Sequence, residues 1–90
     1  MQTILVVDDE DAIRGLIKTT LGIGGYAIRE ARNGKETSQL LEQFVPDLLI
    51  TDLLMPEKEG IELIQEVRRS HPKIPIIAIS GRRPIKREST

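Results

Sequence analysis

The stretch TILVVDDE, residues 3–10, decides the fold that we expect for this chain. Its consecutive aliphatic residues are typical of a strand buried on both faces, as in a parallel sheet, and Asp8 and Asp9 follow directly. A second run, Leu-Leu-Ile-Thr at positions 48–51, is followed by Asp52. Because the carboxyl ends of parallel strands meet at the ligand-binding edge of an open α/β sheet, these acids should gather there.

A cluster of three carboxylates carries a cost in free energy. Two carboxylates 4 Å apart repel each other by about 1–4 kcal/mol, depending on the local dielectric. A hard cation such as Mg²⁺ would offset this repulsion, because Mg²⁺ prefers oxygen ligands. The sequence therefore predicts a divalent-ion site with a carboxylate that could take part in phosphoryl chemistry.

Length and composition limit the classes of protein that fit. The 90 residues make one domain, and with 39% hydrophobic residues, one Phe, one Tyr and no Trp its core must be aliphatic. A net charge of −1 gives no electrostatic case for direct binding to nucleic acid. The lack of cysteine excludes disulfide and thiol chemistry. With no evident signal peptide and no apolar run as long as a membrane span, we expect a soluble, cytoplasmic domain.

Apolar runs alternate with helical periodicity, which favours an α/β fold with a parallel sheet. We expect four strands, at residues 3–7, 26–30, 47–51 and 74–79. The second of these mixes polar and apolar residues, so we place it at an edge of the sheet. Apolar residues at helical spacing predict one helix after each of the first three strands. These residues are Ile13, Leu16, Ile17 and Leu21, then Leu40, Leu41 and Phe44, then Ile61, Leu63, Ile64 and Val67.

The dipeptide Asn33-Gly34 allows two interpretations. Asn-Gly is typical of a hairpin turn, but Glu36 and Leu40 follow at the spacing that marks the start of a helix. We therefore expect Asn33 to be the N-cap of the second helix, in a variant of the capping box. Pro46 should close that helix.

Four segments carry a family resemblance: VVDDE at 6–10, ARNGKE at 31–36, DLLMPEKEG at 52–60, and the apolar strand that ends at Ser80 and Gly81. In these segments the chain resembles the receiver domain of bacterial two-component response regulators. The resemblance implies a flavodoxin-like, doubly wound parallel sheet. It covers residues 1–81 and leaves residues 82–90 as a polar, basic tail. The family continues with a fourth helix, a fifth strand and a fifth helix that have no counterpart in this sequence, so we expect the strand order 2-1-3-4.

The resemblance also implies a role for each acid. Asp52 would be the phosphoacceptor, whose carboxylate attacks the phosphoryl group of a phosphohistidine on a sensor histidine kinase or a histidine phosphotransfer protein. Asp9 and Asp52 would ligate Mg²⁺ directly and Asp8 mainly through water, with the backbone carbonyl of Leu54 as a further ligand. Such a domain accepts a phosphoryl group for signalling and is not a turnover enzyme.

Ser80 and Gly81 would complete the phosphoryl site in the same family. Ser80 would hydrogen-bond the phosphoryl oxygens, and Gly81 would keep the approach to them open. The lysine that ends the family's fifth strand has no counterpart here, because no apolar strand leads into Lys86.

Two alternative functions stay open. The triplet Asp9-Glu10-Asp11 resembles the nucleophile motif of haloacid-dehalogenase-type phosphatases, and Ser80 resembles their second motif. Against this alternative, no later lysine or acidic pair follows, and Asp52 would go unexplained. The second alternative follows from the missing lysine. The chain could be an inactive receiver remnant, or a protein-interaction module that keeps the fold without the chemistry.

The fourth strand predicts a contact between copies of the chain. Without a fifth strand beside it, the segment 74–79 would be an apolar, uncharged edge with open N–H and C=O groups, which natural proteins normally block. Pro75 blocks only its start. The missing fifth helix would also uncover apolar surface beside the first helix. We therefore expect a homo-oligomer that pairs through the fourth strand.

Overall fold

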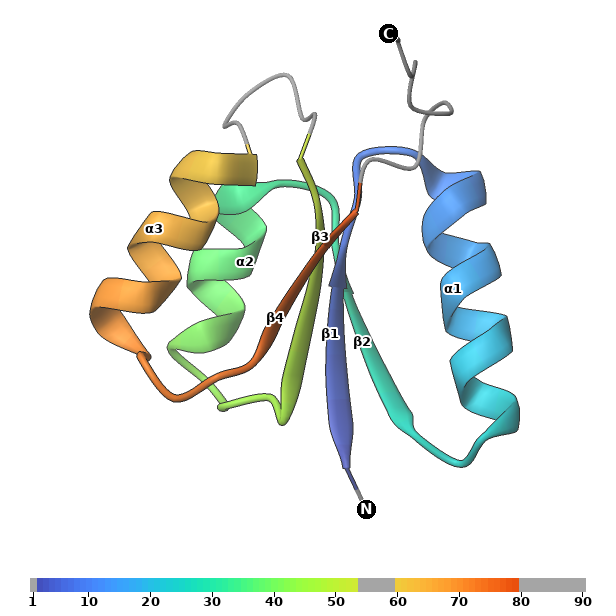
Figure 1. The fold of residues 1–90 in the computed structure, drawn as a ribbon. Helices are drawn as coiled ribbons and strands as arrows, with labels where there is room; N and C mark the ends of the chain where they lie inside the picture. The colour runs from blue at the N-terminus through green and yellow to red at the C-terminus, as the bar shows by residue number, and fades with distance from the viewer. Residues whose placement is uncertain (1, 54–59, 80–90) are drawn as a thin grey trace, which may run out of the picture.

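Four parallel strands form one sheet in the computed structural model of this chain, which describes residues 2–53 and 60–79. The strands are β1 (Thr3–Val7), β2 (Ala27–Ala31), β3 (Leu48–Asp52) and β4 (Ile76–Ile79). Their order across the sheet is β2-β1-β3-β4, and every pairing is parallel. The structure confirms the expected strand order and the edge position of the second strand (Figure 1).

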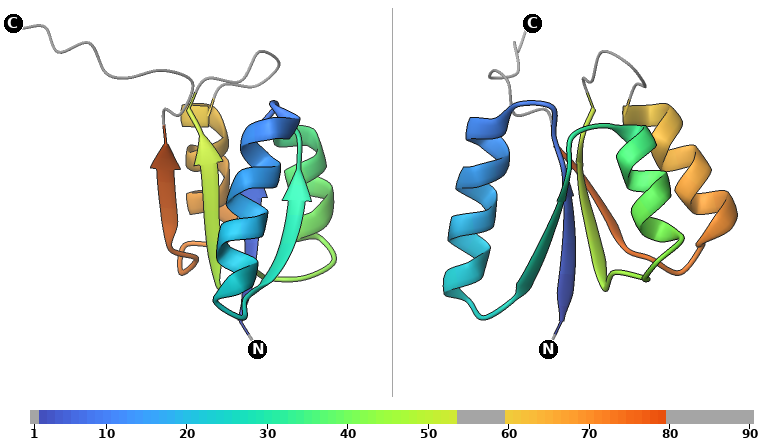
Figure 2. Two further views of the ribbon diagram at one scale, coloured as in Figure 1. Left: turned by 90° about the vertical axis from the view of Figure 1, so that its right-hand side faces the viewer. Right: turned by 180° about the vertical axis from the view of Figure 1, so that it is seen from behind.

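Three helices cover the two faces of the sheet. They are α1 (Asp11–Ile23), α2 (Gly34–Leu41) and α3 (Gly60–Ser70). Figures 1 and 2 show α1 alone on one face and α2 and α3 together on the other, which is the arrangement of a doubly wound fold. Within the described part of the chain, no helix is both long and apolar enough to cross a membrane.

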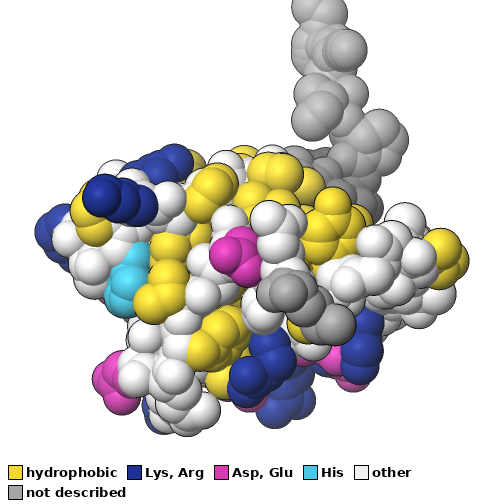
Figure 3. Space-filling view, turned by 90° about the horizontal axis from the view of Figure 1, so that it is seen from below, with side chains coloured by type: hydrophobic (Ala, Val, Ile, Leu, Met, Phe, Trp, Pro, Cys, Tyr) yellow, Lys and Arg dark blue, Asp and Glu magenta, His cyan; other side chains and the backbone are white. Residues whose placement is uncertain are grey.

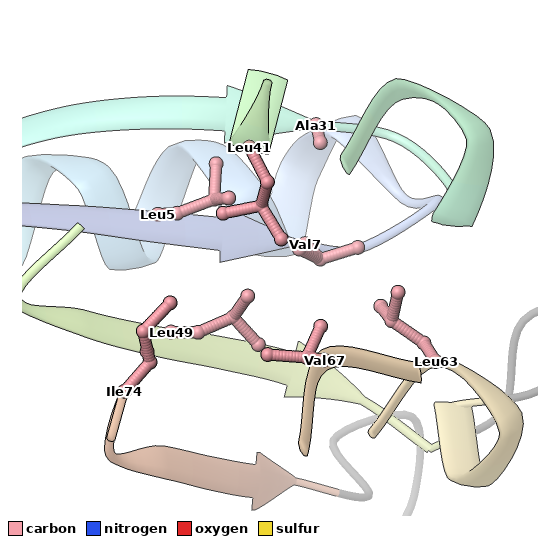
Figure 4. Close-up of a cluster of buried hydrophobic side chains, with 8 residues drawn as sticks. All are labelled: Leu5, Val7, Ala31, Leu41, Leu49, Leu63, Val67 and Ile74. Atoms are coloured by element: carbon pink, nitrogen blue, oxygen red, sulfur yellow. The ribbon is translucent and has the colours of Figure 1, made fainter. Parts of the chain in front are cut away.

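The main hydrophobic core fills the space between the sheet and the layer of α2 and α3. Strand side chains alternate between the two faces, so every second residue of β1 points into this core. Figure 4 shows its buried members together: Leu5, Val7, Ala31, Leu41, Leu49, Leu63, Val67 and Ile74. All of them are aliphatic, as the composition predicts.

The face under α1 has a smaller core. Ile4, Val6 and Ile50 are buried there, whereas no residue of α1 is fully buried. Leu16 of α1 is 64% exposed, although its spacing matches that of the buried face, and Ile77 of β4 is 49% exposed. Because α1 packs mainly on β1 and β2, it leaves apolar surface open beside it among the described residues.

Apolar side chains also gather at the amino ends of the strands. Figure 3 looks onto this end of the molecule and shows hydrophobic side chains spread across it. Ile23 and Tyr26, which precede β2, and Val45, which precedes β3, are all exposed. The predicted acid cluster lies at the opposite, carboxyl end of the strands. One end of the sheet therefore carries exposed apolar side chains and the other carries carboxylates.

Several strand boundaries differ from the predicted ones. β2 and β3 each begin and end one residue later than expected, so Asp52 is the last residue of its strand rather than the residue after it. β4 begins at Ile76 and not at Ile74, since Pro75 has no N–H for the strand ladder.

Two helices also differ in detail from the expectation. α2 ends at Leu41, so Phe44 lies beyond it and the prediction that Pro46 closes this helix is wrong. In α3, Leu63 and Val67 are buried while Ile61 is 56% exposed, so the buried face lies to one side of the predicted one. α3 begins against the end of β3, where the N–H of Gly60 donates to the carbonyl oxygen of Leu53.

Asn33 is the N-cap of α2, as predicted. Its Oδ1 accepts a hydrogen bond from the N–H of Glu36 at 2.8 Å. A carboxylate oxygen of Glu36 in turn accepts one from the N–H of Arg32 at 2.7 Å. The return bond reaches the residue before the cap rather than the cap itself, which is how this start varies the capping box.

Replacing Asn33 by alanine should lower the free energy of unfolding by about 1 kcal/mol, because an N–H at the start of α2 loses its acceptor. Urea denaturation measures the change. Asn33→Ser is the matched control and should behave nearly as wild type, since serine also caps helices well. An unchanged midpoint for Asn33→Ala would contradict the cap.

Candidate functional site

Three aspartates meet at the carboxyl edge of the sheet, the upper end in Figure 1. Asp8 and Asp9 follow β1, and Asp52 ends the neighbouring strand β3. Each offers a carboxylate oxygen, and these three atoms lie within 4.8 Å of one another. Asp8 and Asp52 are buried, and Asp9 is half-buried. The structure therefore brings together the three acids that the sequence singles out.

Asp8 is held through its backbone and its side chain. Its N–H donates to the carbonyl oxygen of Ala31 at the end of β2, at 3.1 Å. Its Oδ1 accepts from the N–H of Glu10 at 2.9 Å, and its carbonyl oxygen accepts from Nη1 of Arg14 at 2.8 Å. These bonds define the turn from β1 to α1, and so the place of Asp9 within it.

The end of β3 is held by its neighbours β4 and α3. The N–H of Leu53 donates to the carbonyl oxygen of Ile79 at 2.8 Å, and the N–H of Gly60 donates to that of Leu53 at 3.1 Å. A Cβ atom on Gly60 would lie 2.3 Å from the carbonyl oxygen of Asp52 and 2.5 Å from Cα of Leu53. Glycine is therefore required here for α3 to begin against the strand that carries Asp52. The sequence marks Gly60 only as the end of a motif and does not reveal this contact.

Arg14 connects the acid-bearing turn to β2. Its Nε donates to Oε1 of Glu30 at 3.0 Å and its Nη2 to Oδ1 of Asp11 at 2.5 Å, while Nζ of Lys18 lies 3.0 Å from Oε2 of Glu30. The hydrogen bond from Lys18, with that from Arg14, lowers the pKa of Glu30 against the effect of burial. Burial alone would lower the pKa of Arg14, but the hydrogen bonds to Asp11 and Glu30 outweigh it and raise that pKa. No sequence motif singles out Arg14, although its i, i+3 spacing from Asp11 is visible.

Three predicted site residues lie outside the described residues. They are Leu54, with its backbone carbonyl, Ser80 and Gly81. The predicted tail at 82–90 and its boundary with the domain lie outside as well. The roles given to these residues therefore stay predictions.

The donor set of the acid cluster fits a hard divalent cation. Its members are all carboxylates, and Mg²⁺ is commonly held by one or two carboxylates together with water and phosphate oxygens. A cation would also remove the repulsion between acids that the fold holds close together. A doubly wound parallel sheet with carboxylates gathered at its carboxyl edge defines an α/β module that binds its ligand at that edge.

Comparison with known proteins gives the family. Residues 4–88 match the family model of the response regulator receiver domain. The chain belongs to this family, whose members are signalling modules of two-component phosphorelay systems and in general not catalysts. Membership confirms the resemblance and the flavodoxin-like fold that the sequence segments imply.

Two curated relatives contain a stretch similar to this chain. Response regulator protein PilR of Pseudomonas aeruginosa is 40% identical over 80 residues, which cover 89% of this chain and 18% of PilR. Sensor kinase CckA of Brucella abortus is 38% identical over 81 residues, which cover 88% of this chain and 9% of CckA. The chain thus spans less than a fifth of either relative.

Solved structures share the fold of the described elements. Response regulator protein TrrA of Thermotoga maritima, in complex with Mg(2+)-BeF, matches with a TM-score of 0.83 and 41% identity, over 87% of this chain and 68% of TrrA. The signal receiver domain of a signal transduction histidine kinase from Syntrophus aciditrophicus matches with a TM-score of 0.84 and 33% identity, over 88% of this chain and 61% of that one.

Proposed function

We propose that this chain is a phosphoacceptor module of a two-component phosphorelay, in which Asp52 receives the phosphoryl group. The observation that carries the proposal is the cluster of Asp8, Asp9 and Asp52, in which Asp52 ends an interior strand of the sheet. Phosphoryl transfer requires mainly in-line positioning and neutralisation of oxygen charge. A fixed group of carboxylates that can hold a cation is suited to both requirements.

In the proposed transfer, a carboxylate oxygen of Asp52 attacks the phosphorus atom of a phosphohistidine. A P–O bond forms as the P–N bond breaks, and the donor's imidazole nitrogen keeps the electron pair and takes up a proton. The product is an aspartyl phosphate, which water can later hydrolyse to restore the carboxylate. Family resemblance supports a hydrogen bond from Ser80 to the phosphoryl oxygens and an open approach at Gly81.

Mg²⁺ is the cofactor of this proposal. Asp9 and Asp52 would be direct ligands, Asp8 would act mainly through water, and the carbonyl of Leu54 would add a further oxygen. When bound, Mg²⁺ would neutralise negative charge on the carboxylates and on the phosphoryl oxygens. The Mg(2+)-BeF complex of the related TrrA supports this assignment.

The proposed donor is a sensor histidine kinase or a histidine phosphotransfer protein. Matches to both a response regulator, PilR, and a sensor kinase, CckA, support partners of this class. We also propose a cytoplasmic location and no direct contact with nucleic acid, since a net charge of −1 offers no excess of basic groups.

Incubation with acetyl phosphate and Mg²⁺ tests the proposed function. Intact-mass spectrometry should show the addition of one phosphoryl group. No phosphoryl group should be added when EDTA is present from the start of the reaction. Release of phosphate from many substrate molecules per protein molecule would instead support the phosphatase alternative. A chain that is folded but never modified would be the inactive remnant, and the proposal would be wrong.

We further propose that two copies of the chain pair through β4. This strand bonds to β3 on one side, and within residues 2–53 and 60–79 no strand lies on its other side. Ile77 of β4 is also 49% exposed. Pairing of two such edges would satisfy the open backbone groups and cover apolar side chains at once.

Light scattering after size exclusion, across micromolar concentrations, should give a mass above that of the monomer. Ile77→Lys should shift the protein towards the monomer, because a charge on an edge strand opposes pairing. Ile61→Lys, at an exposed isoleucine on α3, is the control and should leave the mass unchanged. A wild-type monomer at every concentration would contradict pairing through β4.

A further inference from the structure

We infer that Arg14 is a positioning residue for the metal site and acts through the backbone carbonyl of Asp8. The inference rests on the proposed function, because it concerns the Mg²⁺ site proposed there. Nη1 of Arg14 donates to the carbonyl oxygen of Asp8 at 2.8 Å. The other donors of the same guanidinium bind Asp11 and Glu30.

The guanidinium of Arg14 joins three segments of the chain. Its side chain is 11% exposed, and its donors reach the turn after β1, the first residue of α1, and β2. Because the donors are fixed in one plane, the three partners are fixed relative to one another. The turn that carries Asp8 and Asp9 therefore has its position set from α1 and β2, and a residue without this planar fork could not replace all three bonds.

The same network adds little net charge near the site. Two cations, Arg14 and Lys18, face two carboxylates, Asp11 and Glu30. Removal of Arg14 would leave the carboxylates in excess, and on charge alone this would strengthen the binding of a divalent cation. Loss of positioning has the opposite effect, because Mg²⁺ demands near-ideal octahedral geometry. The direction of the change in Mg²⁺ affinity therefore separates a positioning role from a purely electrostatic one.

Ca²⁺ separates a positioning role from a general loss of stability. It accepts irregular coordination by flexible oxygen ligands, whereas Mg²⁺ does not. A displaced turn should therefore weaken Mg²⁺ binding much more than Ca²⁺ binding. A variant that is merely less stable would keep the wild-type ratio of the two affinities in its folded fraction.

Calorimetric titration of Arg14→Met and Arg14→Lys with Mg²⁺ and with Ca²⁺ tests the inference. We expect Arg14→Met to bind Mg²⁺ about ten- to a hundredfold more weakly than wild type, in the range seen when supporting groups of a metal site are removed. Its Ca²⁺ affinity should change about threefold or less. Arg14→Lys keeps the charge but not the planar fork, and its Mg²⁺ affinity should also fall. Lys18→Met, which removes a cation that contacts Glu30 in the same network, is the matched control and should bind Mg²⁺ at least as tightly as wild type.

If Arg14→Met binds Mg²⁺ as tightly as wild type or more tightly, the inference is wrong, but the proposed metal site is not contradicted. Failure of the wild-type chain to bind Mg²⁺ would overturn the proposed function, and the inference with it. The amide NMR spectrum shows whether each variant is folded. If Arg14→Met is not folded, Arg14→Lys decides: wild-type Mg²⁺ affinity and an unchanged Mg²⁺ to Ca²⁺ ratio would overturn the inference.

Discussion

Asp52→Asn is expected to abolish phosphorylation and at the same time to stabilise the metal-free fold. The amide lacks the negative charge that makes the carboxylate a nucleophile, so no phosphoryl group should be accepted. Stabilisation follows from the geometry of the cluster, in which three carboxylate oxygens lie within 4.8 Å of one another. Each pair at this distance repels by about 1–3 kcal/mol, and the substitution removes two of the three pairs. We expect the free energy of unfolding without Mg²⁺ to rise by about 2–6 kcal/mol, the sum over the two pairs.

Urea denaturation with and without Mg²⁺, together with acetyl phosphate labelling, measures both effects. Wild type should gain stability when Mg²⁺ binds, and Asp52→Asn should gain much less, so its advantage should shrink or reverse. Asp47→Asn is the matched control, because it removes the same charge before β3 begins, where Asp47 accepts from the N–H of Thr3 at 2.7 Å. The control should be labelled like wild type. Wild-type labelling of Asp52→Asn would show that Asp52 is not the acceptor.

Gly60→Ala is expected to lower stability and to disturb the acid cluster. Alanine favours a helix over glycine by about 1 kcal/mol, so propensity alone predicts a gain. The new Cβ, however, would lie 2.3 Å from the carbonyl oxygen of Asp52, and backbone atoms cannot rotate away as a flexible side chain can. Such overpacking typically costs about 1–3 kcal/mol. The steric effect should prevail, and α3 should move away from the end of β3.

Gly15→Ala is the control for this substitution. Gly15 also lies in a helix, but a Cβ there meets nothing within 4 Å, so the change should stabilise the protein by about 1 kcal/mol. Thermal or urea unfolding compares the two variants, and amide chemical shifts at Asp52 and Leu53 report the local movement. If Gly60→Ala were as stabilising as Gly15→Ala, α3 could not begin where the structure has it.

Local sequence signals were sufficient for the existence of the four strands and for the meeting of the acids, whereas the strand order was predicted from the family resemblance. The aliphatic run before Asp8 can only be buried on both faces, and a parallel sheet then places the carboxyl ends of its strands at one edge. Asn33 was likewise predictable as a cap, because its partner Glu36 lies within the same turn.

Features that depend on tertiary contacts were not predictable in the same way. In α3, Ile61 and Leu63 both fit helical spacing, but Leu63 is buried and Ile61 is 56% exposed, in a helix that begins with Gly60 against the end of β3. β2 extends to Ala31 because its register pairs Val7 with Ala31, a relation between distant parts of the chain.

The part of the site beyond the acids was also hidden in the sequence. The hydrogen bond from Arg14 is accepted by the backbone carbonyl oxygen of Asp8. Every residue type has such an oxygen, so the sequence cannot predict this bond. The atoms that leave no room for a Cβ on Gly60 are also backbone atoms, the carbonyl oxygen of Asp52 and Cα of Leu53. Motif spacing predicts which side chains converge, whereas these supports depend on the path of the main chain.

Titration of the wild-type chain with Mg²⁺, followed by amide chemical shifts, tests most directly whether the three aspartates form a metal site. The shifts that change should centre on Asp8, Asp9 and Asp52 and should saturate. Asp9→Ala should bind about tenfold more weakly or worse, because it loses a charged ligand. Glu42→Gln, at an exposed acid at the end of α2, should bind as wild type does. Equal Mg²⁺ affinity in wild type and Asp9→Ala, or no saturable change near the acids, would contradict the proposed site.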